Sequence, residues 1–178
     1  MRRRKVCVLG PSGVGKTTLI RTAFLRLPVK PELEQPTIGA AFHSVHIDND
    51  IKVEVWDTAG QERYAGLVPM YIRGCACILV CFDTSQPDTA RIARDMANVR
   101  HYSPDSTIIL VGTKSDTGTS TPLDDEYSRV ILTSAVTKDG LEELRAAVAS
   151  VPALPAPVTP TVRVHSEQGV ARTALCCW

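Results

Sequence analysis

The stretch Gly10-Pro11-Ser12-Gly13-Val14-Gly15-Lys16-Thr17 decides the fold of this 178-residue chain. It follows an apolar run at residues 6–9 and precedes a helix-compatible segment at residues 18–27. This strand–loop–helix context is the one that the pattern G-x-x-x-x-G-K-[ST] requires. Glycines let successive backbone N–H groups point into one concavity, and the helix N-terminus behind them also favours anions. Lys16 adds a mobile positive charge for the outer phosphates, and the Thr17 hydroxyl is a ligand for Mg²⁺. A glycine-rich turn with a chance lysine is the weaker alternative, because every fixed position of the pattern is present. The stretch predicts a nucleoside triphosphate site made by Ser12, Gly13, Val14, Gly15, Lys16, Thr17 and Thr18.

The composition is that of one globular domain. Hydrophobic residues make up 44% and charged residues 22%, and the formal net charge of +1 gives no reason to expect nucleic acid as a partner. The basic run at residues 2–5 reads as a solvated end rather than a functional patch, although it could help hold the chain to an anionic membrane. No stretch is apolar enough to span a bilayer and no signal peptide opens the chain, so we expect a cytoplasmic protein.

Strands and helices alternate along the chain. Strands are expected at residues 5–9, 75–82, 107–111 and 129–132, with an antiparallel hairpin of residues 42–47 and 51–56. Helices are expected at residues 18–27, near 69–73, from 87–88 to about 102, and at 138–150. The fold class is therefore α/β, with a mostly parallel six-stranded sheet, one antiparallel hairpin strand and helices on both faces. In such sheets ligands bind at the carboxyl ends of the strands, and every polar cluster discussed below lies at such an end.

The domain is expected to comprise residues 1–151. Residues 152–178 contain Pro152, Pro155, Pro157 and Pro160 without periodicity, which is typical of a flexible tether. Of the six cysteines, Cys7, Cys75, Cys77 and Cys81 lie in apolar runs, and the odd spacing of the last three predicts side chains on one face of a strand. We interpret them as small buried hydrophobic residues rather than as a metal site.

Two further clusters suit phosphate and metal chemistry. Asp57 ends a strand downstream of the phosphate loop and could hold Mg²⁺, while the N–H of Gly60 could approach a terminal phosphate and Gln61 could orient the attacking water. Thr37 lies on a loop, where its hydroxyl could complete the metal shell only while a γ-phosphate is present. The metal ligands are thus Thr17, Thr37 and Asp57, and the catalytic residue is Gln61.

The sequence Thr113-Lys114-Ser115-Asp116 ends a buried strand and suits a guanine base. The Asp116 carboxylate could accept hydrogen bonds from N1–H and the exocyclic amine of guanine, whereas adenine would leave it unpaired. A site of this kind rejects a base that lacks those groups by about 10⁴-fold. The Lys114 stem could pack along the base, and Ser134-Ala135 would offer backbone N–H to the guanine O6, with Val136 expected in the same nucleotide-binding site.

Together these motifs resemble those of the Ras superfamily of small GTPases over residues 5–150. Residues 38–42, 56–64 and 70–74 resemble the Rab branch, nearest to its endosomal members. The resemblance implies a Mg²⁺-dependent GTP/GDP switch with exchange factors, GAPs and effectors as partners, acting in vesicular membrane trafficking. It implies slow hydrolysis by Gln61, since the chain shows no arginine finger in cis and a GAP could add about 10³–10⁵-fold.

The same resemblance assigns an effector surface and a lipid anchor. The effector-contacting residues match Ile38, Phe42, Trp56 and Tyr71, although the aromatic three could also be ordinary core residues. The chain ends Leu175-Cys176-Cys177-Trp178, and the pair Cys176 and Cys177 resembles the double-geranylgeranylation signal of Rab proteins. Two lipids would give stable, reversible attachment to the cytosolic face of an internal membrane. An exposed cysteine pair without function is the alternative.

Three departures from the family bear on nucleotide affinity. Thr113 stands where most Rab proteins have asparagine, and it can make only part of the tie between base site and phosphate loop. Lys30 occupies the place of an aromatic residue over the guanine, and the stretch between Asp116 and Thr133 is short and without apolar period. A GTP-binding scaffold with little hydrolysis is therefore the second hypothesis, to be separated by the dependence of hydrolysis on Gln61. A third, an ATP-using P-loop kinase, conflicts with Asp116 and would be separated by nucleotide competition.

Overall fold

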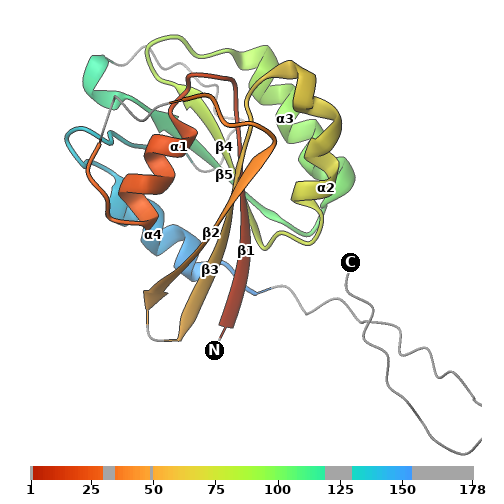
Figure 1. The fold of residues 1–178 in the computed structure, drawn as a ribbon, viewed down its shortest axis with the longest axis horizontal. Helices are drawn as coiled ribbons and strands as arrows, with labels where there is room; N and C mark the ends of the chain where they lie inside the picture. The colour runs from red at the N-terminus through yellow and green to blue at the C-terminus, as the bar shows by residue number, and fades with distance from the viewer. Residues whose placement is uncertain (1, 30–34, 49, 119–129, 154–178) are drawn as a thin grey trace, which may run out of the picture.

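The computed structural model describes residues 2–29, 35–48, 50–118 and 130–153 (Figure 1). Within these residues the strands form one sheet of six in the order β2-β3-β1-β4-β5-β6. The strands are β1 (Arg2–Leu9), β2 (Ala40–Asp48), β3 (Ile51–Thr58), β4 (Cys77–Asp83), β5 (Thr107–Thr113) and β6 (Val130–Leu132). β2 and β3 pair antiparallel, and all other neighbours are parallel. The predicted fold class is confirmed.

Helices cover both faces of the sheet (Figure 1). They are α1 (Lys16–Leu19), which continues as the π-helical turn η1 (Ile20–Phe24), α2 (Val68–Ile72), α3 (Thr89–Tyr102) and α4 (Leu141–Ser150), with short 3₁₀ turns η3 (Glu62–Leu67) and η4 (Ser115–Thr117). Side chains alternate across each strand. Val6 and Val8 of β1 therefore join the core under α1 and α4, while Cys7 and Leu9 join the core under α2 and α3.

Several element boundaries differ from the prediction. The first helix begins at Lys16, two residues before the predicted start, and its last turn ends at Phe24, because Arg26 takes a left-handed φ of 53°. The last helix begins at Leu141 instead of residue 138, because Gly140 before it has a φ of 69°. Within the part of the chain that the structure describes, no helix is long and apolar enough to cross a membrane.

The predicted solvated end is wrong in part: Arg2 and Arg3 are exposed, but the run belongs to β1 and Arg4 is buried. Arg2, Arg3 and Arg4 extend β1 and pair with Ile51, Lys52 and Val53 of β3. Arg4 is only 4% exposed, and its Nε donates to the carbonyl of Val151 at 2.6 Å. The sequence suggested a free end because charges are rarely buried. The arginine instead ties the first strand to Val151, the first residue after α4.

We expect Arg4→Ala to lower the free energy of unfolding by about 2 kcal/mol, through loss of its packed stem and of the hydrogen bond to Val151. Arg3→Ala is the matched control, because Arg3 is exposed on the same strand, and its effect should stay within about 0.5 kcal/mol. Urea denaturation of both variants measures the difference. Equal effects would mean that the run is solvated after all.

All four described cysteines are free and buried, as predicted. The prediction that Cys75, Cys77 and Cys81 share one face of a strand was wrong for Cys75. Cys77 and Cys81 of β4 face the α1/α4 core, whereas Cys75 lies before the strand and joins the other core. Its thiol donates to the carbonyl of Tyr71 at 3.3 Å. The described residues contain no cluster of three or more His, Cys, Asp or Glu that could hold a metal ion.

Candidate functional site

The phosphate loop joins the carboxyl end of β1 to α1 and requires glycine at two positions. Gly10 has a φ of 141°, and a Cβ there would lie 2.5 Å from the carbonyl oxygen of Cys81. Gly15 caps α1 with a φ of 96°. No L-residue adopts either arrangement without strain. The loop therefore packs directly on β4 and leads into α1, so that its last backbone N–H groups lie at the helix N-terminus.

Lys16 lies inside the loop. Its Nζ donates to the carbonyls of Gly10 at 2.9 Å and Pro11 at 2.8 Å. Burial lowers the pKa of Lys16, although Asp57 and other nearby groups partly offset this. The Lys16 ammonium thus lies next to the loop with two carbonyls as its acceptors. Because it is already buried, a phosphate oxygen that binds there need not displace its full hydration shell.

The predicted metal ligands meet at one point. The Thr17 hydroxyl donates to Asp57 Oδ2 at 2.7 Å and lies 3.1 Å from the Thr37 hydroxyl, which is itself 3.5 Å from the same Oδ2. They come from α1, from the loop before β2 and from the end of β3. Burial raises the pKa of Asp57, and the hydrogen bond from Thr17 opposes that rise. The other oxygen, Oδ1, is buried and has no partner among the described residues.

An unpartnered carboxylate oxygen beside two hydroxyls fits Mg²⁺, which prefers hard oxygen ligands. Mg²⁺ also keeps several waters or phosphate oxygens in its shell, so one carboxylate and two hydroxyls are sufficient from the protein. The donor set is poorly suited to zinc, whose protein ligands are mostly nitrogen and sulfur.

Two neighbouring cavities surround the loop. One, of about 180 Å³, is lined by Lys16, Thr17, Thr37, Gly60 and Gln61 among others. The other, of about 290 Å³, is lined by Thr113, Lys114, Asp116, Ala135 and Val136 among others. Gly13, Gly15 and Thr18 border both, so one elongated ligand could occupy the two together.

Gly60 closes the first cavity by close backbone packing. A Cβ at this position would lie 2.5 Å from Lys16 Nζ and equally close to the backbone of Pro11 and Ser12. Gln61 follows it at the cavity wall. The segment that carries Gln61 therefore touches the phosphate loop without any intervening side chain.

Thr113 ties the base cavity to the phosphate loop. Its hydroxyl donates to the carbonyl of Val14 at 2.7 Å and lies 3.0 Å from that of Phe82. The predicted partial tie between base site and phosphate loop is thus made to the loop's backbone. Lys114 has a left-handed φ of 58°, and its Nζ pairs with Asp83 at 2.8 Å.

Ser134, in the loop after β6, holds the Asp116 carboxylate in place. Ser134 Oγ donates to Asp116 Oδ1 at 2.5 Å and accepts the N–H of Val136 at 3.2 Å. The expectation that Ser134 offers its own N–H to a base needs correction, because that group donates to the carbonyl of Asp139 at 3.1 Å. Among the described residues the N–H of Ala135 has no acceptor, so Ala135 is the donor left for a ligand.

The sequence analysis missed four residues that line the base cavity: Leu19, Val29, Thr117 and Thr133. Val29 follows a proline in a loop without apolar period, and Thr117 lies past the recognised motif, so no signal marked these two. Lys30, the predicted weak point over the base, lies outside the described residues. The segments 119–129 and 154–178 lie outside them too, including Cys176 and Cys177.

The four predicted effector residues lie on and beside the β2–β3 side of the sheet. The rings of Phe42 and Trp56 are 5.2 Å apart, and those of Trp56 and Tyr71 are 5.6 Å apart. Trp56 and Tyr71 pack partly against the α2/α3 core, while Phe42 and Ile38 are 51% and 77% exposed. These four side chains thus join the core at Trp56 and Tyr71 and form exposed apolar surface at Phe42 and Ile38.

Comparison with known proteins gives the family. Residues 5–116 match the family model described as "Roc: Ras of Complex, Roc, domain of DAPkinase". The chain is 36% identical over 121 residues to "Ras-related protein Rab-22A" of Mus musculus and of Homo sapiens, covering 65% of this chain and 61% of each relative. It is 43% identical over 117 residues to "GTP-binding protein YPT53" of Saccharomyces cerevisiae (strain ATCC 204508 / S288c), covering 63% of this chain and 52% of that protein.

The chain thus spans little more than half the length of the curated relatives that it matches. The matched region nonetheless contains the phosphate loop, the Thr17–Thr37–Asp57 cluster and Asp116. With a mostly parallel six-stranded sheet around these residues, the chain belongs to the Ras-like GTPase family, with Rab proteins among its relatives.

Proposed function

We propose that the chain is a Rab-like molecular switch that binds GTP and GDP, hydrolyses GTP slowly and regulates vesicular membrane trafficking. The observation that carries the proposal is the Asp57 carboxylate, which is buried, accepts from Thr17 and has one oxygen with no partner in the part of the chain that the structure describes. An ionised group is costly in such a place unless a charge of the opposite sign joins it. Mg²⁺ with a nucleotide supplies that charge.

Thr17, Thr37 and Asp57 would hold the metal, two through hydroxyl oxygens and one through its carboxylate. Bound Mg²⁺ supplies positive charge to the β- and γ-phosphate oxygens. The chain's own residues do the rest: Lys16 gives a second positive charge, and the N–H groups from Gly13 to Thr18 hold the phosphates in place.

Gln61 would orient the attacking water. It lies beside Gly60 on the wall of the phosphate cavity, which supports this role. Positioning alone gives slow turnover, and a GAP that contributes an arginine would add about 10³–10⁵-fold. The reset of the switch would therefore depend on a partner.

Thr37 would report the state of the nucleotide. Its hydroxyl reaches the Asp57 cluster across a loop that also carries the exposed Ile38. When the γ-phosphate leaves, that loop loses its ligand and is released, and the nearby surface of Phe42, Trp56 and Tyr71 changes with it. Effectors that dock on these side chains would then distinguish the two states.

Exchange factors, GAPs and effector proteins are the expected partners. Geranylgeranyl groups on Cys176 and Cys177 would attach the protein reversibly to the cytosolic face of an internal membrane, of endosomal type by resemblance. The relative named as a Rab protein of type 22A supports trafficking as the process.

The decisive test is Gln61→Leu. Single-turnover GTP hydrolysis with Mg²⁺ should slow by at least about tenfold, because the leucine cannot hold the water. The Kd values for GTP and GDP should stay within about threefold, since Gln61 is at the wall of the cavity and is not an anchor of the phosphates.

Gln35→Leu is the matched control, because Gln35 lines the same cavity without an assigned role. Its hydrolysis rate should equal that of the unchanged protein. Hydrolysis that is absent in the unchanged protein, or independent of Gln61, would favour the scaffold hypothesis.

A further inference from the structure

Helix α3 carries an ion pair that faces the interior. Arg91 Nε contacts Asp95 Oδ1 at 3.2 Å and Oδ2 at 3.1 Å, and the two side chains are only 12% and 9% exposed. Asp88 caps the same helix by accepting the N–H of Arg91 at 2.9 Å. A charged pair one helical turn apart is usually a solvated feature. This one is buried.

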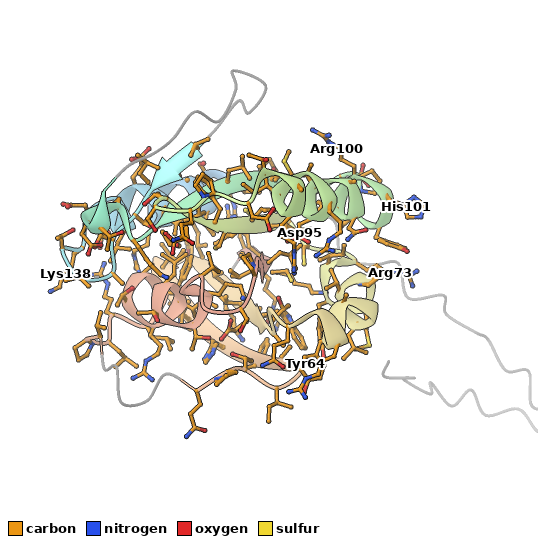
Figure 2. All side chains as sticks on the ribbon, turned by 90° about the horizontal axis from the view of Figure 1, so that it is seen from above. Tyr64, Arg73, Asp95, Arg100, His101 and Lys138 are labelled. Atoms are coloured by element: carbon orange, nitrogen blue, oxygen red, sulfur yellow. The ribbon has the colours of Figure 1, made fainter. Side chains whose placement is uncertain are left out.

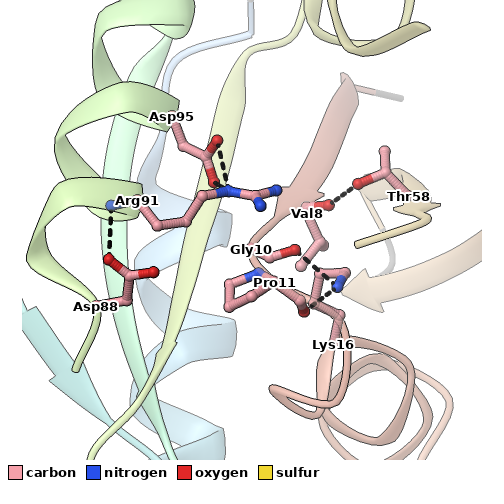
Figure 3. Close-up of polar contacts among 8 residues, drawn as sticks. All are labelled: Val8, Gly10, Pro11, Lys16, Thr58, Asp88, Arg91 and Asp95. Carbon is pink, nitrogen blue, oxygen red and sulfur yellow. Dashed lines mark hydrogen bonds and ion pairs between the residues drawn. The ribbon is translucent and has the colours of Figure 1, made fainter. Parts of the chain in front are cut away.

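The pair faces the phosphate loop from the side opposite Lys16. A cavity of about 330 Å³ is lined by Pro11, Ser12, Gly13 and Val14 on one wall and by Arg91 and Asp95 on another. Figure 3 shows the Arg91 guanidinium directed toward Gly10 and Pro11, the residues whose carbonyls accept the Lys16 ammonium. Asp95 as a whole residue is only 6% exposed, whereas Figure 2 shows Arg100 and His101 at the outer end of the same helix.

The electrostatic influence of the pair reaches Lys16. Burial is the main reason why the pKa of Lys16 is lowered; Arg91 lowers it further, and Asp95 acts in the opposite sense. Cys81 and Asp57 are the other groups that act on Lys16, and both raise its pKa. The two members of the pair therefore oppose each other at the ammonium that meets the phosphates.

A buried ion pair is a poor way to stabilise a fold, because desolvation offsets its attraction and apolar residues of the same volume often serve better. Apolar neighbours are available here, since Ile92 and Phe82 line the same cavity. A role in the adjacent site explains the pair better than stability does.

We propose that Arg91 and Asp95 form a positioning pair that balances the electrostatic field behind the phosphate loop and thereby sets the preference for GTP over GDP. The proposal rests on the proposed function. GTP carries about one more negative charge than GDP next to the loop. Arg91 alone would favour the triphosphate, and Asp95 alone would favour the diphosphate. Paired, they keep the two affinities close enough for exchange to work in both directions.

Removing one charge at a time tests this. At a separation on the order of 10 Å and an effective dielectric near 20, one unbalanced charge changes the GTP/GDP affinity ratio by about 10- to 20-fold. Asp95→Asn should move the ratio toward GTP, and Arg91→Gln should move it toward GDP. The double variant Arg91→Gln/Asp95→Asn should return to within about twofold of the unchanged protein. Competition of unlabelled GTP and GDP against a fluorescent guanine nucleotide gives the ratios.

Arg100→Gln and Asp105→Asn are the matched controls, since each makes the same charge change at an exposed position. Both should leave the ratio unchanged. A purely structural role for the pair predicts that both single variants lower both affinities without opposite shifts, and that result overturns the proposal. Should Arg91→Gln fail to fold, Asp95→Asn and the double variant still decide, because the first must shift toward GTP and the second must not. An unchanged protein that binds neither nucleotide overturns the proposed function instead.

Discussion

Replacing Asp116 by asparagine should lower the affinity for GDP by at least about 100-fold and raise that for xanthosine diphosphate. The Asp116 carboxylate, steadied by Ser134 Oγ at 2.5 Å, can accept from both N1–H and the exocyclic amine of guanine. Asparagine can still accept N1–H, but it loses the charge-assisted bond to the amine, about 1.5–3 kcal/mol, and sets its own N–H group against that amine, at a further cost of about 1–3 kcal/mol. Asparagine presents one acceptor and one donor, which suits the N1–H and the carbonyl at C2 of xanthine. Competition by GDP and xanthosine diphosphate against one labelled nucleotide measures the exchange of preference.

Asp105→Asn is the control, an exposed carboxylate in the turn between α3 and β5. A preference for guanine that survives Asp116→Asn would remove the carboxylate from the base site. Equal loss of both purine nucleotides, with a lowered melting temperature, would show instead that the variant had broken the loop held by Ser134.

The sequence predicts those parts of the site in which a given residue type at a given spacing serves a single chemical role. Thr17, Thr37 and Asp57 are separated by 20 residues each, and they meet because all three lie at the carboxyl edge of a parallel sheet. The phosphate loop was readable for the same reason. Gly10 lies against the backbone of Cys81, where no side chain fits. A position of this kind requires glycine, and the requirement is visible in the sequence pattern.

What could not be predicted depends on which partner a side chain meets. Arg4 belongs to a run of basic residues, and only the pairing of β1 with β3 and the position of Val151 bury it. Arg91 and Asp95 have the spacing of a surface helix pair, and only the packing of α3 against the phosphate loop turns them inward. The backbone N–H of Ser134 was predicted to bind the base, but it donates to the carbonyl of Asp139 within its own loop. The sequence does not show that Asp139 folds back onto Ser134.

Gly60→Ala should lower the affinity for GTP by about 10- to 100-fold while leaving that for GDP within about threefold. A Cβ at this position would lie 2.5 Å from Lys16 Nζ, which could move, and from the backbone of Pro11 and Ser12, which could not. Forced contacts of this kind cost about 1–3 kcal/mol, which corresponds to roughly 5- to 150-fold in an equilibrium constant. The cost falls on the state in which Gly60 abuts the phosphate loop. A γ-phosphate that accepts the Gly60 N–H demands that state, whereas a diphosphate lets the segment move away.

Gly66→Ala is the matched control, because a Cβ there meets nothing within 4 Å. It should leave both affinities unchanged. The distinction between the two nucleotides is the sharp part of the expectation, since general misfolding would weaken both. If Gly60→Ala weakens GDP as much as GTP, Gly60 shapes the loop in every state and does not sense the last phosphate. If it weakens neither, the segment carrying Gln61 does not close on the phosphate loop when GTP is bound.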